Sequence, residues 1–274
     1  MNLRQVRDDW VPPILRRCMR ALRGKPRTAI QFHGDYARWE EAQRCCGGYH
    51  QDQILDRVLE SAMRVVRGEA AFERDSVNFA KPEYAWPLLS ALLWSAARRG
   101  GALRVVDYGG SLGSAYFQHR RFLSHLKELR WRVVEQPHFV AAGIKHLQDE
   151  HLRFHTDLQD ACRDDRPDVV LASSVLQYLP DPVRALDELA SIHAQVLLLD
   201  RTCFDREMDR AVLRVQRVPA SIYEASYPCW FLDEAQIDHV ACSHGYEVVA
   251  EFPALDRLDV RAEWKGKIFM RSER

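Results

Sequence analysis

Acidic residues and glycines stand together behind an apolar run in the middle of the chain. The run 103–108 contains Asp107, and Gly109, Gly110 and Gly113 follow within a few residues. A strand that ends on a carboxylate and continues into a small-residue turn brings charge and bare backbone to the edge of a sheet, where a cofactor can be held. A tight turn that serves packing alone is the alternative interpretation of these glycines.

A second apolar run, 131–135, ends on another acid, Glu135, one strand–helix unit later. A carboxylate has two acceptor oxygens and can take both hydroxyl protons of a ribose. The two runs together therefore predict a nucleoside-binding α/β domain. A solvated acid at a strand end is the alternative for Glu135.

The hydrophobic pattern beyond residue 102 alternates between strand and helix periods. We predict strands at 103–108, 131–135, 152–156, 168–173 and 195–200, and helices at about 112–129, 138–149, 158–163 and 182–192. This alternation predicts a parallel sheet with helices on both faces. Two final runs, 246–252 and 267–271, have no helical crossover between them and predict an antiparallel hairpin at one edge.

The part before residue 102 has helical periodicity. We predict helices from 35 to 42, from 54 to 66 and from 84 to 97, the last ended by Gly100 and Gly101. The expected organisation is a basic amphipathic helix or tail at 1–28, an N-terminal helical cap or lid at 29–101, and an α/β domain at 102–274.

Composition excludes some classes of function. The chain of 274 residues has 39 basic and 39 acidic side chains, so its overall charge points neither to nucleic acid nor to an acidic ligand. Seven cysteines form no C-x-x-C pair, the histidines lack metal-ligand spacing, and no apolar run is long enough to span a bilayer. We expect a cytoplasmic protein without a metal.

Arginines are concentrated in residues 1–27, opposite apolar residues at helical spacing. A basic amphipathic helix can lie on an anionic membrane surface, so peripheral membrane contact is one expectation. A helix packed on its own domain, or a partly ordered tail, is the other.

These motifs resemble the Rossmann-like class I methyltransferases, which use S-adenosylmethionine. More narrowly, they resemble a family of bacterial methyltransferases often associated with surface-polysaccharide gene regions. The resemblance covers the chain from about residue 30 and is carried by the segments 34–42, 72–77, 106–114, 134–140, 173–182 and 200–202. It implies a mostly parallel seven-stranded sheet, S-adenosylmethionine as cofactor, and a small-molecule or sugar substrate. Ser111 departs from the family's middle glycine, and a serine fits there if its φ is negative.

The resemblance also implies roles for the cofactor-binding residues. Asp107 and the glycines would hold the methionine part of the cofactor, and Glu135 its ribose. Asp157 would either meet the adenine amino group or cap the following helix. The implied cofactor-binding set is Asp107, Gly109, Gly110, Gly113, Glu135, Asp157, Ser173 and Ser174.

Catalytic candidates stand at the ends of the later strands. Asp200, His138 or His119 could act as a base toward an acceptor hydroxyl, and Arg201 could bind an anionic group. A structural Asp200–Arg201 pair that braces a loop is the alternative. The substrate-binding candidates are Arg74, Gln177, Tyr178, Tyr223 and Tyr227.

Three functions are compatible with these patterns. The first is O-methylation of a small molecule or sugar, with a role in polysaccharide biosynthesis. The second is a non-catalytic binding protein that keeps the fold. The third, a nicotinamide-dependent oxidoreductase, is disfavoured by the missing second glycine and by the terminal hairpin.

Overall fold

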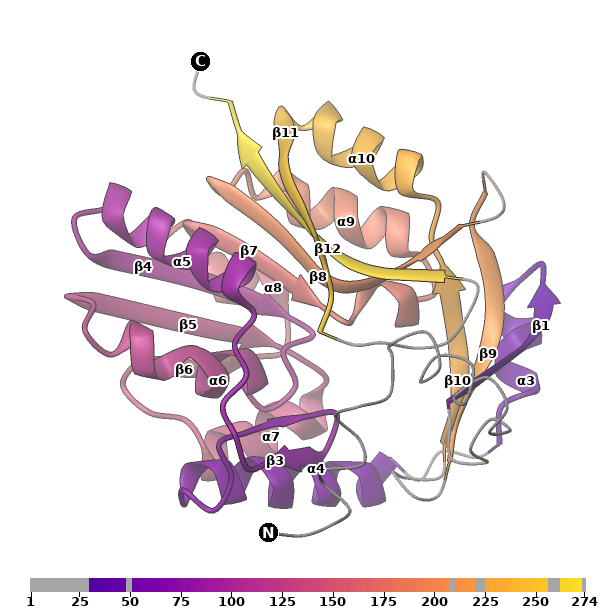
Figure 1. Ribbon diagram of the computed structural model, residues 1–274, viewed down its shortest axis with the longest axis horizontal. Coiled ribbons are helices and arrows are strands. Elements are labelled where there is room, and N and C mark those ends of the chain that lie inside the picture. The colour runs from indigo at the N-terminus through magenta and orange to yellow at the C-terminus, as the bar shows by residue number, and fades with distance from the viewer. Residues whose placement is uncertain (1–29, 48–50, 207–209, 220–224, 256–261, 273–274) are drawn as a thin grey trace, which may run out of the picture.

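The computed structural model describes residues 30–47, 51–206, 210–219, 225–255 and 262–272 (Figure 1). The basic segment predicted at 1–28 and the candidate Tyr223 lie outside these ranges. Within them, no helix combines the length and the apolar character that crossing a membrane requires.

A seven-stranded sheet forms the centre of the molecule. Its strands are β4 (Ala102–Tyr108), β5 (Glu128–Val134), β6 (Leu152–His155), β7 (Val169–Ser173), β8 (Val196–Asp205), β11 (Tyr246–Pro253) and β12 (Ala262–Arg271). They lie in the order β11-β12-β8-β7-β4-β5-β6. The five strands from β4 to β8 run parallel, whereas β12 is antiparallel to both of its neighbours. This is the Rossmann-like class I methyltransferase fold, so the predicted fold class is confirmed.

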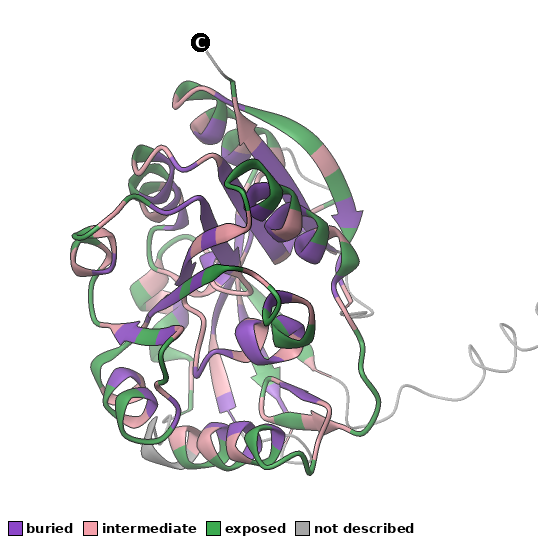
Figure 2. Cartoon of the chain, turned by 90° about the vertical axis from the view of Figure 1, so that its left-hand side faces the viewer, coloured by how far each residue is buried: buried purple, intermediate pink, exposed green. Residues whose placement is uncertain are grey.

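Helices cover both faces of this sheet. They are α4 (Gln51–Val66), α5 (Trp86–Arg98), α6 (Ser114–Leu123), α7 (Pro137–His146), α8 (Leu158–Cys162), α9 (Pro182–Ser191) and α10 (Glu234–Ser243). Val105 packs with α4 to α7, and its neighbour Val106 packs with α8 to α10. Because the sheet is covered on both sides, β7 is an almost continuous apolar run, and β4, β7 and β8 are buried over most of their length (Figure 2).

A smaller sheet stands beside the central one. It consists of β1 (Gln31–Tyr36), β9 (Val212–Val218) and β10 (Ala225–Phe231), in the order β1-β9-β10 (Figure 1). The helix α3 (Trp39–Arg44) follows β1, and a hairpin of β2 (Phe72–Arg74) and β3 (Val77–Phe79) follows α4. The prediction of a helical segment at 29–101 is therefore wrong for β1, β2 and β3.

The helix predicted at 35–42 begins only at Trp39, because the preceding residues pair with β9. Gly34 and Asp35 are residues that strands avoid, so the pairing partner rather than local preference makes this segment a strand. Two other boundaries also differ from prediction. The helix predicted at 112–129 ends at Leu123, and β8 continues to Asp205 because β12 pairs along its whole length.

Candidate functional site

A cavity of about 830 Å³ opens at the carboxyl ends of the parallel strands. The chain continues from β4 to β5 on one side, whereas β7 lies on the other, so strand order reverses between β4 and β7. Ligands of open α/β sheets bind at such a reversal. The β2–β3 turn and the inner residues of β9 and β10 form the other walls of the cavity.

Asp107 at the end of β4 is fully buried in the wall of this cavity. Its Oδ2 accepts a hydrogen bond from Trp131 Nε1 at 3.0 Å, and its Oδ1 has no partner among the described residues. Burial raises the pKa of Asp107 to about 7, against the opposite effect of the Trp131 bond. Gly110 passes so close that a Cβ there would lie 2.5 Å from the carboxylate, so only glycine fits.

The turn after β4 is held in left-handed backbone conformations. Gly109 has φ +70°, and Gly113, the N-cap of α6, has φ +86°. Ser111 has φ +55°, so the condition stated for a serine at this position, a negative φ, is not met. Gly109, Gly110 and Ser111 line the cavity, whereas Gly113 packs against Leu152 behind it.

Strained backbone gathers around this cavity. The described residues include six non-glycine residues with positive φ, and five of them line it: Asp75, Ser76, Ser111, Ser174 and Arg201. Each left-handed non-glycine residue costs about 1 kcal/mol, and such residues cluster where the surrounding structure serves binding or catalysis. The backbone therefore marks this cavity as a candidate site independently of the side chains.

Besides Gly113, two predicted cofactor residues lie outside the cavity lining. Glu135 is half-buried beside Gln136, which does line the cavity; burial, with a smaller effect of Asp107, raises the pKa of Glu135 to about 7. Asp157 is exposed and accepts the backbone N–H of Asp160 at 2.7 Å as the N-cap of α8. Asp157 was predicted either to contact the adenine or to cap a helix, and in the structure it caps α8.

The ends of β7 and β8 are joined by polar contacts. Ser173 Oγ donates to Asp200 Oδ2 at 3.1 Å, and the Ser174 N–H donates to the Asp200 carbonyl at 2.9 Å. Gln177, in the 3₁₀ turn Leu176–Tyr178, is fully buried and donates to the Arg201 carbonyl at 3.1 Å. Ser173, Ser174 and Asp200 line the cavity, whereas Gln177 supports it from behind.

Two arginines connect the cavity wall to the β2–β3 hairpin. Arg201, at the end of the parallel part of β8, forms an ion pair with Asp75 in the hairpin turn. Arg74 pairs with Glu83 at 3.0 Å and lies over the ring of Phe79, 5.1 Å from its centroid. Both arginines line the cavity, and the Arg201 pair fastens the hairpin to the edge of the central sheet.

The small sheet contributes a wall of hydroxyl and amide groups. Tyr178 Oη donates to Gln216 Oε1 at 3.1 Å, and Gln216 Nε2 donates to Tyr227 Oη at 3.1 Å. The two tyrosine rings meet edge to face, with centroids 5.2 Å apart. Tyr178 and Tyr227, two of the substrate-binding candidates, thus lie together in one wall of the cavity. Gln216, which lies between them, was not predicted from the sequence.

Glu73 is a second candidate site residue that the sequence interpretation missed. It is buried in the cavity wall, where it accepts hydrogen bonds from Ser114 Oγ and, at 3.3 Å, from the Ser76 N–H. Burial raises the pKa of this carboxyl. Glu73 reaches the cavity because the hairpin packs beside the start of α6. This placement depends on tertiary packing, so no local sequence pattern predicts that Glu73 lines the cavity.

The histidines proposed as bases lie away from the cavity lining. His138 is half-buried with its ring 4.9 Å from that of Phe139, and Phe139 rather than His138 lines the cavity. His119 is fully buried within α6, bonded to the Ala115 carbonyl at 2.9 Å, and burial lowers its pKa to about 4. Of the three candidate bases, only Asp200 borders the cavity.

Similarity to known proteins is found among solved structures. No protein-family model and no curated protein sequence matches the chain. Among solved structures, it is similar to magnesium protoporphyrin IX methyltransferase of Synechocystis with bound S-adenosylmethionine, at 15% identity and TM-score 0.44, over 82% of this chain and 100% of that one. It is also similar to CalS10, an amino pentose methyltransferase of Micromonospora echinaspora, at 16% identity and TM-score 0.45, over 78% and 97% of the two chains. The fold assignment itself rests on the strand order.

Proposed function

We propose that this protein is an S-adenosylmethionine-dependent methyltransferase that acts on a small molecule or a sugar. The observation that supports this most is the wall around Asp107. An unpartnered carboxylate oxygen, the backbone of Gly109 and Gly110, and a strand-order reversal meet there at one cavity. This combination is what a nucleoside cofactor requires of the fold.

The residues present fit such a cofactor. Asp107 Oδ1 offers an acceptor without a partner among the described residues, and Gly109 and Gly110 bring backbone to the same wall. Glu135, at the next strand end, would receive the ribose hydroxyls. Ser173 and Ser174 would face the cofactor from β7. When bound, the cofactor supplies a sulfonium methyl group as the electrophile.

The acceptor side of the cavity suits a molecule with hydroxyl groups. Tyr178, Gln216 and Tyr227 present donors and acceptors along one wall, which is the chemistry that recognises a sugar. Asp200 borders the cavity and would take the proton of an acceptor hydroxyl. Aligning the acceptor in this cavity is the protein's main contribution to such a reaction. We therefore favour O-methylation, with polysaccharide biosynthesis as the pathway that the family resemblance suggests.

Titration calorimetry with S-adenosylhomocysteine tests the cofactor site. We expect micromolar binding to the wild-type protein and its loss in Asp107→Ala and Glu135→Ala. Asp56→Ala, at an exposed acid on α4, is the matched control and should bind like the wild type. Absence of binding to ligand-free wild-type protein would refute the proposed cofactor.

A non-catalytic binding protein is the second candidate, and Ser111 is the observation that favours it. A serine in the left-handed conformation narrows the approach to the turn that glycine would leave open. The distinguishing result is tight binding of S-adenosylhomocysteine without methyl transfer to any hydroxylated acceptor in a panel of sugars and nucleotide sugars.

A further inference from the structure

A second cavity, of about 970 Å³, lies at the opposite edge of the central sheet. Its lining comes from the starts of β4, β7, β8 and β11 and from the end of the antiparallel β12. Because parallel strands all begin at one edge, this cavity is on the far side of the sheet from the cavity at Asp107. Its lining is strongly basic and contains Arg99, Arg104, Arg166, Arg271, His193 and His244.

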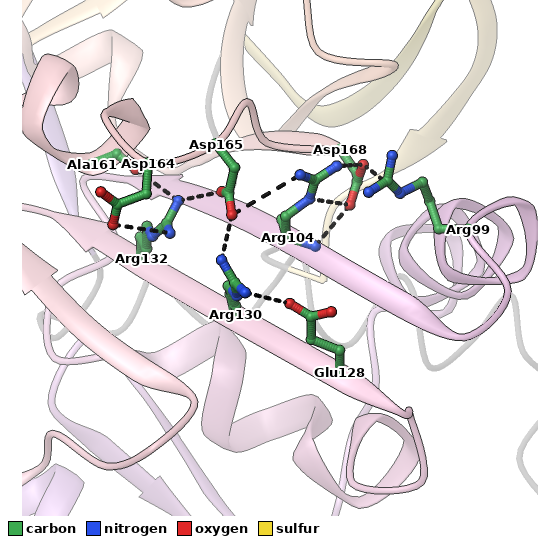
Figure 3. A network of polar contacts seen from close by, with 9 residues as sticks. All are labelled: Arg99, Arg104, Glu128, Arg130, Arg132, Ala161, Asp164, Asp165 and Asp168. Atoms are coloured by element: carbon green, nitrogen blue, oxygen red, sulfur yellow. Dashed lines mark hydrogen bonds and ion pairs between the residues drawn. The ribbon is translucent and has the colours of Figure 1, made fainter.

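Asp168 is the one carboxylate among the described lining residues, and it is already engaged (Figure 3). Its Oδ2 accepts from the Arg104 N–H at 2.9 Å, and its Oδ1 accepts from Arg104 Nη2 at 3.0 Å. Arg99 Nε approaches the same Oδ1 at 3.4 Å. Asp168 thus holds two guanidinium groups at the cavity wall, and both of its carboxylate oxygens are already engaged.

Arg166 and Arg271 also line this cavity. Within the described part of the chain, neither side chain makes an ion pair or a hydrogen bond. Both lie near enough to His193 to lower its pKa, an effect that adds to burial and to that of His244. The guanidinium groups of Arg166 and Arg271 are therefore two charges of the lining that no described carboxylate engages.

His193 carries a further sign of a binding site. Its Nδ1 is buried without a hydrogen-bond partner among the described residues. Its φ of +56° is the left-handed conformation common after a helix C-cap, here Ile192 at the end of α9, and places the ring at the cavity. The His244 ring lies 5.8 Å away, and His244 Nε2 contacts Asp187 Oδ1 at 2.7 Å, so His244 is held in place beside it.

We propose that this amino-edge cavity binds a phosphorylated small molecule with at least two negative charges. Guanidinium groups match phosphate oxygens with paired, charge-assisted hydrogen bonds. The cavity is much larger than a single phosphate, and its arginines come from separate segments, so the charges of the ligand must be spread over more than one group. The site is independent of the proposed methyl transfer, because it shares no lining residue with the other cavity.

Calorimetric titration with inorganic pyrophosphate, at constant ionic strength, tests this proposal. We expect saturable binding that weakens about tenfold when Arg166→Gln or Arg271→Gln removes one charged partner. Arg121→Gln, at an exposed arginine of α6 outside both cavities, is the control and should bind like the wild type. Equal affinity in all four proteins would overturn the proposal.

Two more measurements separate phosphate recognition from general attraction of anions. Pyrophosphate should raise the pKa of His193, followed by the ring proton signals, because an anion offsets the cationic neighbours. Citrate and sulfate at the same ionic strength should bind at least tenfold more weakly. Citrate binding as tight as pyrophosphate, or an unchanged His193 titration, would overturn the assignment. Thermal melting of the variants shows that they remain folded.

Discussion

Replacing Asp107 by asparagine should stabilise the protein at neutral and basic pH while it abolishes cofactor binding. The carboxylate is fully buried, and its one side-chain hydrogen bond among the described residues comes from Trp131. Asparagine has nearly the same shape and keeps an oxygen to accept that bond, but it carries no charge to bury. The amide nitrogen would take the place of the unpartnered Oδ1 at the cavity.

The magnitude follows from the raised pKa. Between the usual 3.8 and about 7, the folded protein keeps a proton on Asp107 that the unfolded chain has released. The free energy of unfolding therefore falls as pH rises through this window, and the loss is complete above about pH 7. Each unit of pKa shift corresponds to about 1.4 kcal/mol, so the full cost of ionised Asp107 is about 4 kcal/mol. At pH 5 it is about 2 kcal/mol.

Urea denaturation of wild-type protein and Asp107→Asn at pH 5 and pH 8 measures this difference. We expect the variant to be more stable at both pH values, with an advantage about 3 kcal/mol larger at pH 8. Asp56→Asn, at an exposed acid, should show no such pH dependence. An advantage of Asp107→Asn that is the same at both pH values would refute the reasoning, since burial of charge would then not set the stability.

Three smaller changes test other parts of the site. Ser111→Gly should raise stability by about 1 kcal/mol in thermal denaturation by relieving the left-handed serine, and unchanged stability would contradict the strain. Asp157→Ala should cost about 1 kcal/mol by removing the cap of α8 while binding of S-adenosylhomocysteine stays the same; weakened binding would instead give Asp157 the adenine role. Tyr178→Phe should lower the free energy of unfolding by about 1 kcal/mol, because the buried Gln216 loses the donor to its Oε1. A variant that unfolds at the same denaturant concentration as the wild type would show that this hydrogen bond does not contribute to stability.

The central sheet could be predicted from the sequence because its strands carry their own signal. Strands buried on both faces are continuous apolar runs, and the acids, serines and glycines that end them mark the edge where they stop. The small sheet could not be predicted in this way. β1 contains Gly34 and Asp35 and is largely exposed, so only its pairing with β9 reveals it as a strand.

The residues of the candidate site likewise fall into those that the sequence predicts and those that it does not. Asp107, Ser173 and Asp200 stand at the ends of parallel strands, and the fold brings such ends together wherever the helices between them lie. Glu73 and Gln216 reach the same cavity from a hairpin and from the small sheet. Their positions depend on how these additions pack against the central sheet, which no local spacing encodes.

The pairing of β1 with β9 has a consequence for how the chain folds during its synthesis. Gln31 pairs with Arg217, so one of the first described segments to leave the ribosome has to wait for a strand made much later. At usual rates of synthesis this delay is on the order of ten seconds or more. During that interval β1 and α3 lack the partner that holds them, while the central strands can already begin to assemble. The cavity at Asp107 is therefore completed late, and correct folding requires that no other segment or chain pairs with β1 in the meantime.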